Sequence, residues 1–121
     1  MDLEAFRAYC LAKKAVTEEL PFGPDALVFK VMGKMFALCS LDAIPFRFSL
    51  KNTPDKNVEL RERYPAIQGA YHMNKTHWSM VEPALGGISE SLIKELIDDS
   101  YELVVAGLTK KQKLELDNLM E

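Results

Sequence analysis

Two apolar runs separated by a three-residue turn constrain the fold of this chain most strongly. Residues 27–31 and 35–41 are rich in β-branched, aromatic and other apolar side chains, and Met32-Gly33-Lys34 lies between them. Glycine supplies the positive φ that a tight turn needs, so this segment predicts a β-hairpin. A third strand is predicted over residues 44–51, where apolar and polar side chains alternate as in a half-buried sheet. The alternating residues are Phe46, Phe48 and Leu50 against Arg47, Ser49 and Lys51.

Four residues with capping side chains mark the expected starts of helices. Each can accept a hydrogen bond from an otherwise unpaired amide in the first helical turn. The first helix should extend its apolar stripe as far as Val16, and the second should end at Arg63. The third should follow Gly86-Gly87, either as one continuous helix or with a break near residues 98–100. The four candidate caps are Asp2, Thr53, Ser89 and Thr109.

Two further strands are predicted on either side of Asn74-Lys75, over residues 71–73 and 76–81, with residues 67–70 as a loop before them. Strands joined by tight turns pair antiparallel, and the terminal helices should cover one face of their sheet. A chain of 121 residues with 48% hydrophobic residues suits one core. We therefore predict a single two-layer α+β domain over residues 1–121, with an antiparallel sheet of about five strands and helices on one face.

The segment Tyr71-His72-Met73-Asn74-Lys75-Thr76-His77-Trp78 contains the only two histidines and the only tryptophan of the chain. Pairing across Asn74-Lys75 predicts that His72 lies opposite His77 and that Tyr71 lies opposite Trp78. Strand alternation would then divide the side chains between the two faces of the sheet. Tyr71, Met73 and Trp78 would face the core, whereas His72, His77 and Ser79 would face the other side.

A histidine pair on one face has several chemical uses. It could begin a zinc site or carry out acid–base chemistry, but no third ligand, nucleophile motif or carboxylate pair accompanies it in the sequence. It could also bind an anion such as phosphate together with Lys75. The remaining alternative is that the histidines and Asn74 hydrogen-bond the local backbone and hold the hairpin. We predict no metal and no other cofactor, and we assign no catalytic residue.

The charge of the chain is unevenly distributed along its length. Residues 26–81 contain eight Lys or Arg and four Asp or Glu, net +4, whereas residues 1–25 are net −2 and residues 82–121 are net −5. Lys30, Arg47 and Lys51 occupy the polar phase of their predicted strands, and Lys34 lies at a turn. If these cations share the open face of the sheet, that face could bind a phosphate backbone despite the total charge of −3. The alternative is a solvated face whose lysines guard the sheet edges against aggregation.

Cysteine usage and hydropathy bear on the compartment. Cys10 and Cys39 each lie within an apolar run, so we expect two buried, reduced thiols. The N-terminus lacks a basic segment followed by an apolar one, which argues against a signal peptide. No run of about 18 apolar residues occurs, so we expect no membrane span. These features favour a cytoplasmic protein without a membrane partner.

Three blocks of the sequence stand out together: Val28–Ala37, Tyr71–Lys75 with His77-Trp78, and Ser100–Val104. They resemble the MmcQ/YjbR family of small bacterial proteins, and the resemblance covers nearly the whole chain. The resemblance implies a two-layer α+β domain with an antiparallel sheet, described in that family as a double wing and labelled DNA-binding. It points to Lys30, Lys34, His72, Asn74, Lys75, His77 and Trp78, without giving any of them a chemical role.

Together these observations lead to one functional hypothesis and two alternatives. We expect a non-enzymatic binding domain that contacts DNA through a basic, open sheet face. The first alternative is a protein–protein interaction module. The second is a small-molecule or acid–base site at His72 and His77. The candidate nucleic-acid-binding residues are Lys30, Lys34, Arg47, Lys51, His72, Asn74, Lys75 and His77.

Overall fold

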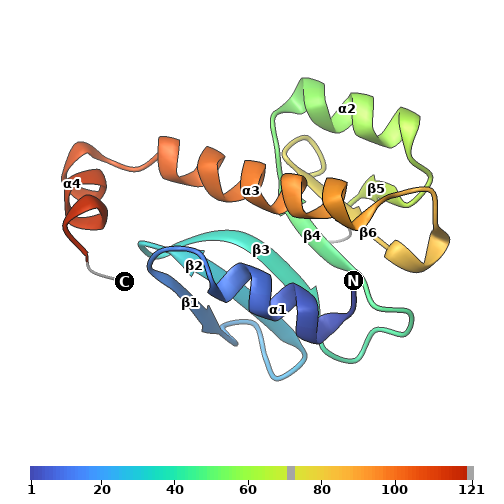
Figure 1. The fold of residues 1–121 in the computed structure, drawn as a ribbon, viewed down its shortest axis with the longest axis horizontal. Helices are drawn as coiled ribbons and strands as arrows, with labels where there is room; N and C mark the ends of the chain where they lie inside the picture. The colour runs from blue at the N-terminus through green and yellow to red at the C-terminus, as the bar shows by residue number, and fades with distance from the viewer. Residues whose placement is uncertain (71–72, 120–121) are drawn as a thin grey trace.

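A six-stranded antiparallel sheet forms the centre of the computed structural model, which describes residues 1–70 and 73–119 (Figure 1). The strand order is β1-β2-β3-β4-β6-β5. The predicted α+β class is therefore confirmed, and the sheet has one strand more than the predicted five or so. The strands are β1 (Val16–Glu19), β2 (Ala26–Val31), β3 (Lys34–Ser40), β4 (Phe48–Lys51), β5 (Ile67–Gly69) and β6 (Trp78–Val81).

Each of the four α-helices begins directly after the cap that the sequence predicts. The side-chain oxygens of Asp2, Thr53, Ser89 and Thr109 each accept a hydrogen bond from an amide in the first turn. These bonds satisfy amides that have no partner inside the helix. The helices are α1 (Leu3–Leu11), α2 (Pro54–Arg63), α3 (Glu90–Ala106) and α4 (Lys110–Asn118), and a short 3-10 helix, η1, covers Pro83–Leu85.

The predicted hairpin between β2 and β3 is confirmed, and it contains a bulge. Val31 pairs with Lys34 across Met32 and Gly33, which both have positive φ, as a two-residue hairpin turn requires. The pairing then shifts, because Lys30 pairs with Met35 while Phe29 pairs with Ala37. Phe36 is the extra residue. It is fully buried, so the bulge directs two successive side chains of β3, Phe36 and Ala37, into the core.

The helices bury one face of this sheet. Phe6 of α1 stacks on Phe48 of β4 with ring centroids 4.3 Å apart and meets Phe29 of β2 edge-on at 5.7 Å. The long helix α3 contacts β2, β3 and β4 and buries an apolar stripe that includes Ile93 and Ile97, while α2 contacts β5 (Figure 1). This one-sided packing positions the uncovered face, where the candidate site lies.

Both cysteines are buried in this core, as the sequence predicts. Burial raises the pKa of the Cys10 thiol to about 12 and that of the Cys39 thiol to about 11. Since the thiolate is the reactive form, neither side chain is suited to nucleophilic chemistry in the folded protein.

Two short strands differ from the sequence-based prediction. β1 was expected to be the end of the first helix, but α1 stops at Leu11 and Val16 begins a strand. β5 occupies residues predicted as a loop. Of the predicted strand at residues 71–73, Met73 lies in a bend, and Tyr71 and His72 lie outside the described residues. Strands of three and four residues carry too few side chains for a clear alternation, which explains both errors.

Two further boundaries needed correction. The third predicted strand was expected to begin at Ile44, but β4 begins at Phe48. The intervening Pro45 has no amide hydrogen to donate to a neighbouring strand. α3 runs without interruption through residues 98–100, where a break was one of the two expectations.

Within this stretch, Ser100 links α3 to the sheet. Its hydroxyl donates to the Phe36 carbonyl at 2.5 Å and accepts from the Lys51 amide at 2.9 Å. These two backbone groups lie just beyond Ala37–Leu50, at the end of the ladder between β3 and β4. The fully buried hydroxyl therefore joins two strands at the point where their own pairing ends.

A Ser100 variant tests how much this link between β3 and β4 contributes to the stability of the domain. We expect Ser100→Ala to lower the free energy of unfolding by about 1–3 kcal/mol, because it leaves a buried carbonyl and amide without their partner. Urea denaturation followed by circular dichroism measures the change. Ser91→Ala, which removes an exposed serine hydroxyl from the first turn of the same helix, is the control. Equal midpoints for the two variants would contradict the assignment.

Candidate binding face of the sheet

On β2, β3, β4, β6 and β5, the uncovered face of the sheet consists of three rows of side chains that cross the strands. Strand alternation and the observed register define them. The loop row, near the loops that precede β2 and β4, contains Ala26, Ser40, Arg47 and Glu82. The central row contains Val28, Leu38, Ser49, Met80 and Gln68. The basic row, at the other end of these strands, contains Lys30, Met35, Lys51 and Trp78.

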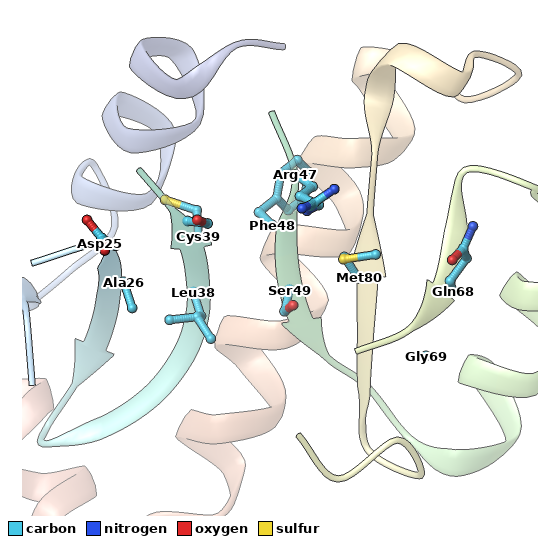
Figure 2. A pocket seen from close by; sticks show the side chains of 11 residues that line it. Asp25, Ala26, Leu38, Cys39, Arg47, Phe48, Ser49, Gln68, Gly69 and Met80 are labelled. Carbon is cyan, nitrogen blue, oxygen red and sulfur yellow. The ribbon is translucent and has the colours of Figure 1, made fainter. Parts of the chain in front are cut away.

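A groove of about 530 Å³ lies over the loop row and the central row (Figure 2). Its apolar surface comes largely from Ala26, Leu38 and Met80, while Ser49 and Gln68 add uncharged polar groups. The charged residues that line it, Asp25 and Arg47, lie toward the loop end. The groove therefore combines an apolar floor with a few polar groups, the usual composition of a small-ligand site.

The predicted cations of the strands are divided between the two ends of this face. Lys30 and Lys51 share the basic row, on strands that are two positions apart in the sheet, and Lys30 Nζ lies 3.3 Å from Glu19 of β1. Arg47 lies in the loop row, where its Nη1 lies 3.4 Å from Glu82 Oε1. The structure thus brings Lys30 and Lys51 together and separates Arg47 from them.

Lys34 and Lys75 do not join the basic row. Lys34 pairs with the buried Val31, so its position in the strand belongs to the covered face of the sheet, although its side chain is exposed at the turn. The methylenes of Lys75 lie against Gly69, since Cδ and Cγ are 3.1 and 3.2 Å from the position that a Cβ there would occupy. Gly69 has the phase of the covered face, so Lys75 approaches β5 from the helical side.

The segment before β6 is a compact turn rather than the predicted hairpin loop. The side-chain oxygen of Asn74 accepts a hydrogen bond from the Thr76 amide at 2.9 Å. The backbone carbonyl of Asn74 accepts hydrogen bonds from the His77 and Trp78 amides. The His77 carbonyl accepts from Asn52. The predicted partner of His77, His72, lies outside the described residues. Asn74 and His77 thus use backbone and local bonds to shape this turn.

The register of β5 and β6 differs from the predicted one by one residue. The predicted pairs would place Ala70 opposite Ser79, but Gly69 pairs with Ser79. Ser79, expected on the open face, is therefore on the covered face and only 3% exposed. Trp78, expected in the core, pairs with Lys51 on the uncovered face, where it is nevertheless 9% exposed. A shift of one residue reverses every side chain of a strand, which accounts for both corrections.

Comparison with known proteins identifies the family. The YjbR family model matches residues 11–103. The chain belongs to the YjbR family. It is 48% identical over 94 residues to the protein YbdF of Escherichia coli O157:H7, covering 77% of this chain and 75% of that protein. It is 28% identical over 113 residues to YjbR of Escherichia coli K12, covering 93% of this chain and 95% of that protein.

Solved structures of similar proteins support the fold of this YjbR-family chain. Protein DR2400 of Deinococcus radiodurans superposes with a TM-score of 0.86 at 37% identity, covering 95% of this chain and 87% of that one. A protein from Pseudomonas syringae superposes with a TM-score of 0.72 at 30% identity, covering 85% of this chain and 98% of that one. The MmcQ/YjbR resemblance is therefore confirmed for family and fold.

Asn57 and Arg61 of α2 hold the β6 segment of this YjbR-family domain in place. The Asn57 amide donates to the carbonyls of Asn52 at 3.2 Å and Thr76 at 3.0 Å, and its oxygen accepts from the Ser79 hydroxyl at 2.9 Å. Arg61 donates to the Ser79 hydroxyl at 3.1 Å, to the Trp78 carbonyl at 2.6 Å and to the Lys75 carbonyl. The histidine–tryptophan block is thus fastened to a neighbouring helix.

Neither α2 residue was among the predicted site residues. A local signal was present, because positions four apart lie on one helical face and Asn57 and Arg61 are so spaced. The partners, however, are up to 22 residues away and belong to a register that was predicted incorrectly. Every residue has a backbone carbonyl, so a side chain that binds one needs no particular residue type as its partner. Such a contact therefore leaves no recognisable pair of residues in the sequence.

Removing the Arg61 guanidinium should loosen this attachment. We expect Arg61→Gln to lower the free energy of unfolding by about 1–3 kcal/mol, since several backbone and hydroxyl acceptors lose a charged donor. Hydrogen exchange should also accelerate at the Trp78 amide relative to the core of β2. Arg63→Gln, two residues further along α2 and exposed, should leave both measurements close to wild type. Unchanged exchange at Trp78 in Arg61→Gln would contradict the role of this side chain.

Proposed function

We propose that this YjbR-family chain is a non-enzymatic binding domain that contacts DNA through the basic row of its uncovered sheet face. The observation that supports the proposal is the placement of Lys30 and Lys51 in one row of that face. They are separated by two strand spacings, or about 10 Å. The relatives named above come from bacteria, and a bacterial, cytoplasmic role with a double-wing mode of contact belongs to the same proposal.

The number of available cations sets the expected strength of this contact. Lys30 pairs with Glu19 at an exposed site, an interaction that a phosphate can replace at small cost. Lys51 forms no ion pair with another described residue. Arg47, Lys34 and Lys75 lie elsewhere, so the basic row provides about two phosphate contacts. With a net charge of −3 opposing association, binding should be weak and independent of sequence.

The salt dependence of DNA binding tests this proposal. For a duplex oligonucleotide, the logarithm of the affinity should fall with the logarithm of the salt concentration with a slope of about −2, as two contacts require. The Lys30→Gln/Lys51→Gln variant should lose this slope and most of the affinity in fluorescence anisotropy. Lys110→Gln/Lys111→Gln, which removes two exposed lysines from α4, should retain both. Equal effects of the two double variants would exclude the basic row as the contact surface.

The loop end of the domain favours a second candidate function, protein interaction. Among the described residues, four of the eight large exposed hydrophobic side chains come from the loops around residues 20–25 and 41–46. The two loops are neighbours, since the Leu41 amide donates to the Asp25 carbonyl at 2.7 Å. Exposed apolar side chains gathered in this way are typical of an interaction surface. The four are Leu20, Phe22, Leu41 and Ile44, of which Phe22 is 69% and Ile44 93% exposed.

Affinity capture with matched variants tests this second candidate. Wild-type protein should retain a specific protein that nuclease treatment does not release, and Phe22→Ser/Ile44→Ser should lose it. Val58→Ser/Leu114→Ser removes two exposed apolar side chains from α2 and α4 and should retain it. Loss of capture in both variants would mean that the loop end has no special part in binding.

A further inference from the structure

The groove on the uncovered face contains a polar pair that neither proposed function uses. Ser49 lies on β4 and Arg47 directly precedes this strand, two residues away in the same alternation, and both side chains line the groove (Figure 2). Residues two apart on one strand are separated by roughly 6.6 Å. A single acidic group above the strand could therefore reach both side chains.

The Ser49 hydroxyl lines the groove without a hydrogen-bond partner among the described residues. Ser49 is only 8% exposed, yet none of the hydrogen bonds between described side chains and backbone groups involves its hydroxyl. Its neighbours in the central row, Leu38 and Met80, offer no conventional hydrogen-bonding group. Every fully buried side-chain polar atom among the described residues has a partner, so the unpartnered Ser49 oxygen is not fully buried. A groove-lining hydroxyl that bonds to no described residue is positioned to donate to a bound molecule.

Arg47 supplies a charge that is only partly neutralised. Its contact with Glu82 joins one nitrogen to one oxygen at 3.4 Å, longer than a strong charge-assisted hydrogen bond. A guanidinium has five N–H donors, so several remain for another acceptor. Its side chain is 43% exposed and can be reached from the groove. The combination of a guanidinium and a serine hydroxyl suits a carboxylate, with one oxygen facing each donor.

The other residues that line the groove indicate the chemical nature of the rest of the ligand, beyond its carboxylate. Leu38 and Met80 lie on either side of Ser49 in the central row, and Ala26 continues the apolar surface toward β2. Asp25 lines the groove at the β2 side, two strand spacings or about 10 Å from β4. A second anionic group at that end would be repelled. The groove volume of about 530 Å³ is in the range of small-ligand sites.

We propose that the groove binds an organic monocarboxylate with an apolar chain, held by Arg47 and Ser49 and lying over Leu38 and Met80. This site goes beyond DNA contact and does not depend on it, because Lys30 and Lys51 lie outside the groove lining. An eight-carbon chain with bonds of about 1.5 Å spans roughly 9 Å when extended, so octanoate reaches from β4 toward β2.

Three matched probes separate charge from apolar contact in an NMR titration of the ¹⁵N-labelled protein. Octanoate should produce saturable shifts of amides in the central and loop rows. Octanamide, which lacks the charge, should bind about tenfold more weakly, since it loses the charge-assisted bonds to Arg47. Suberate, the eight-carbon dicarboxylate, should also bind more weakly than octanoate because its second carboxylate approaches Asp25.

Variants of Arg47 and Ser49 test the two named donors. Arg47→Gln should reduce octanoate affinity about tenfold and remove the preference over octanamide, and Ser49→Ala should reduce the affinity severalfold. Lys51→Gln removes the next cation on the same face of β4 but leaves the groove lining intact, so it should bind octanoate as wild type does. Thermal unfolding followed by Trp78 fluorescence checks that each variant is folded.

The contrary outcomes are distinct. Equal binding of octanoate and octanamide, or equal weakening by Arg47→Gln and Lys51→Gln, would overturn the carboxylate site. Absence of saturable shifts at millimolar octanoate in the folded wild-type protein would overturn it as well. Because DNA contact is measured with Lys30 and Lys51, either proposal can fail while the other stands.

Discussion

One-sided burial of an antiparallel sheet is the constraint on which the rest of this structure depends. Once α1 and α3 cover one face, the register of each strand decides which side chains enter the core and which remain for binding. The bulge at Phe36 adjusts this division, because it sends two successive residues of β3 inward and returns Met35 to the face of Lys30. Ser100 then joins β3 to β4 at the bulge residue itself, through the Phe36 carbonyl and the Lys51 amide. The three rows of the uncovered face exist because these few contacts fix the register.

Local chemistry made much of the fold predictable from the sequence. The tight turn at Met32-Gly33, the alternation in β4 and the four helix caps each depend on residues within about one turn of one another, so their patterns are visible in the chain. The strand β5 and its pairing with β6 were not visible in this way. Its register follows from Asn57 and Arg61, which bind the carbonyls of Thr76, Lys75 and Trp78 from a neighbouring helix. Such contacts leave no periodic signal between the two segments.

The candidate site was less predictable than the fold because its character depends on neighbours in space. The sequence identified Lys30, Arg47 and Lys51 as polar-phase cations, and the structure agrees on their face. It could not show that Glu19 would lie beside Lys30, since β1 itself was read as helix, or that Glu82 would lie beside Arg47 across β6. A count of basic residues therefore predicted a larger positive surface than the paired side chains provide.

The same neighbours divide the uncovered face by chemistry. Glu82 contacts Arg47 at the loop end and leaves most of its donors free. Lys51, four residues further along the chain, pairs with Trp78 at the other end of the face, and Lys30 lies two strands away. Between them, from β2 to β5, lies a central row of uncharged side chains that includes Ser49. A long polyanion matches the basic row, and a small amphipathic acid matches the groove. The two surfaces share β4 but no side chain, so a ligand bound on one surface could affect the other surface only by moving this strand. The bond from the Lys51 amide to the Ser100 hydroxyl anchors β4 to α3.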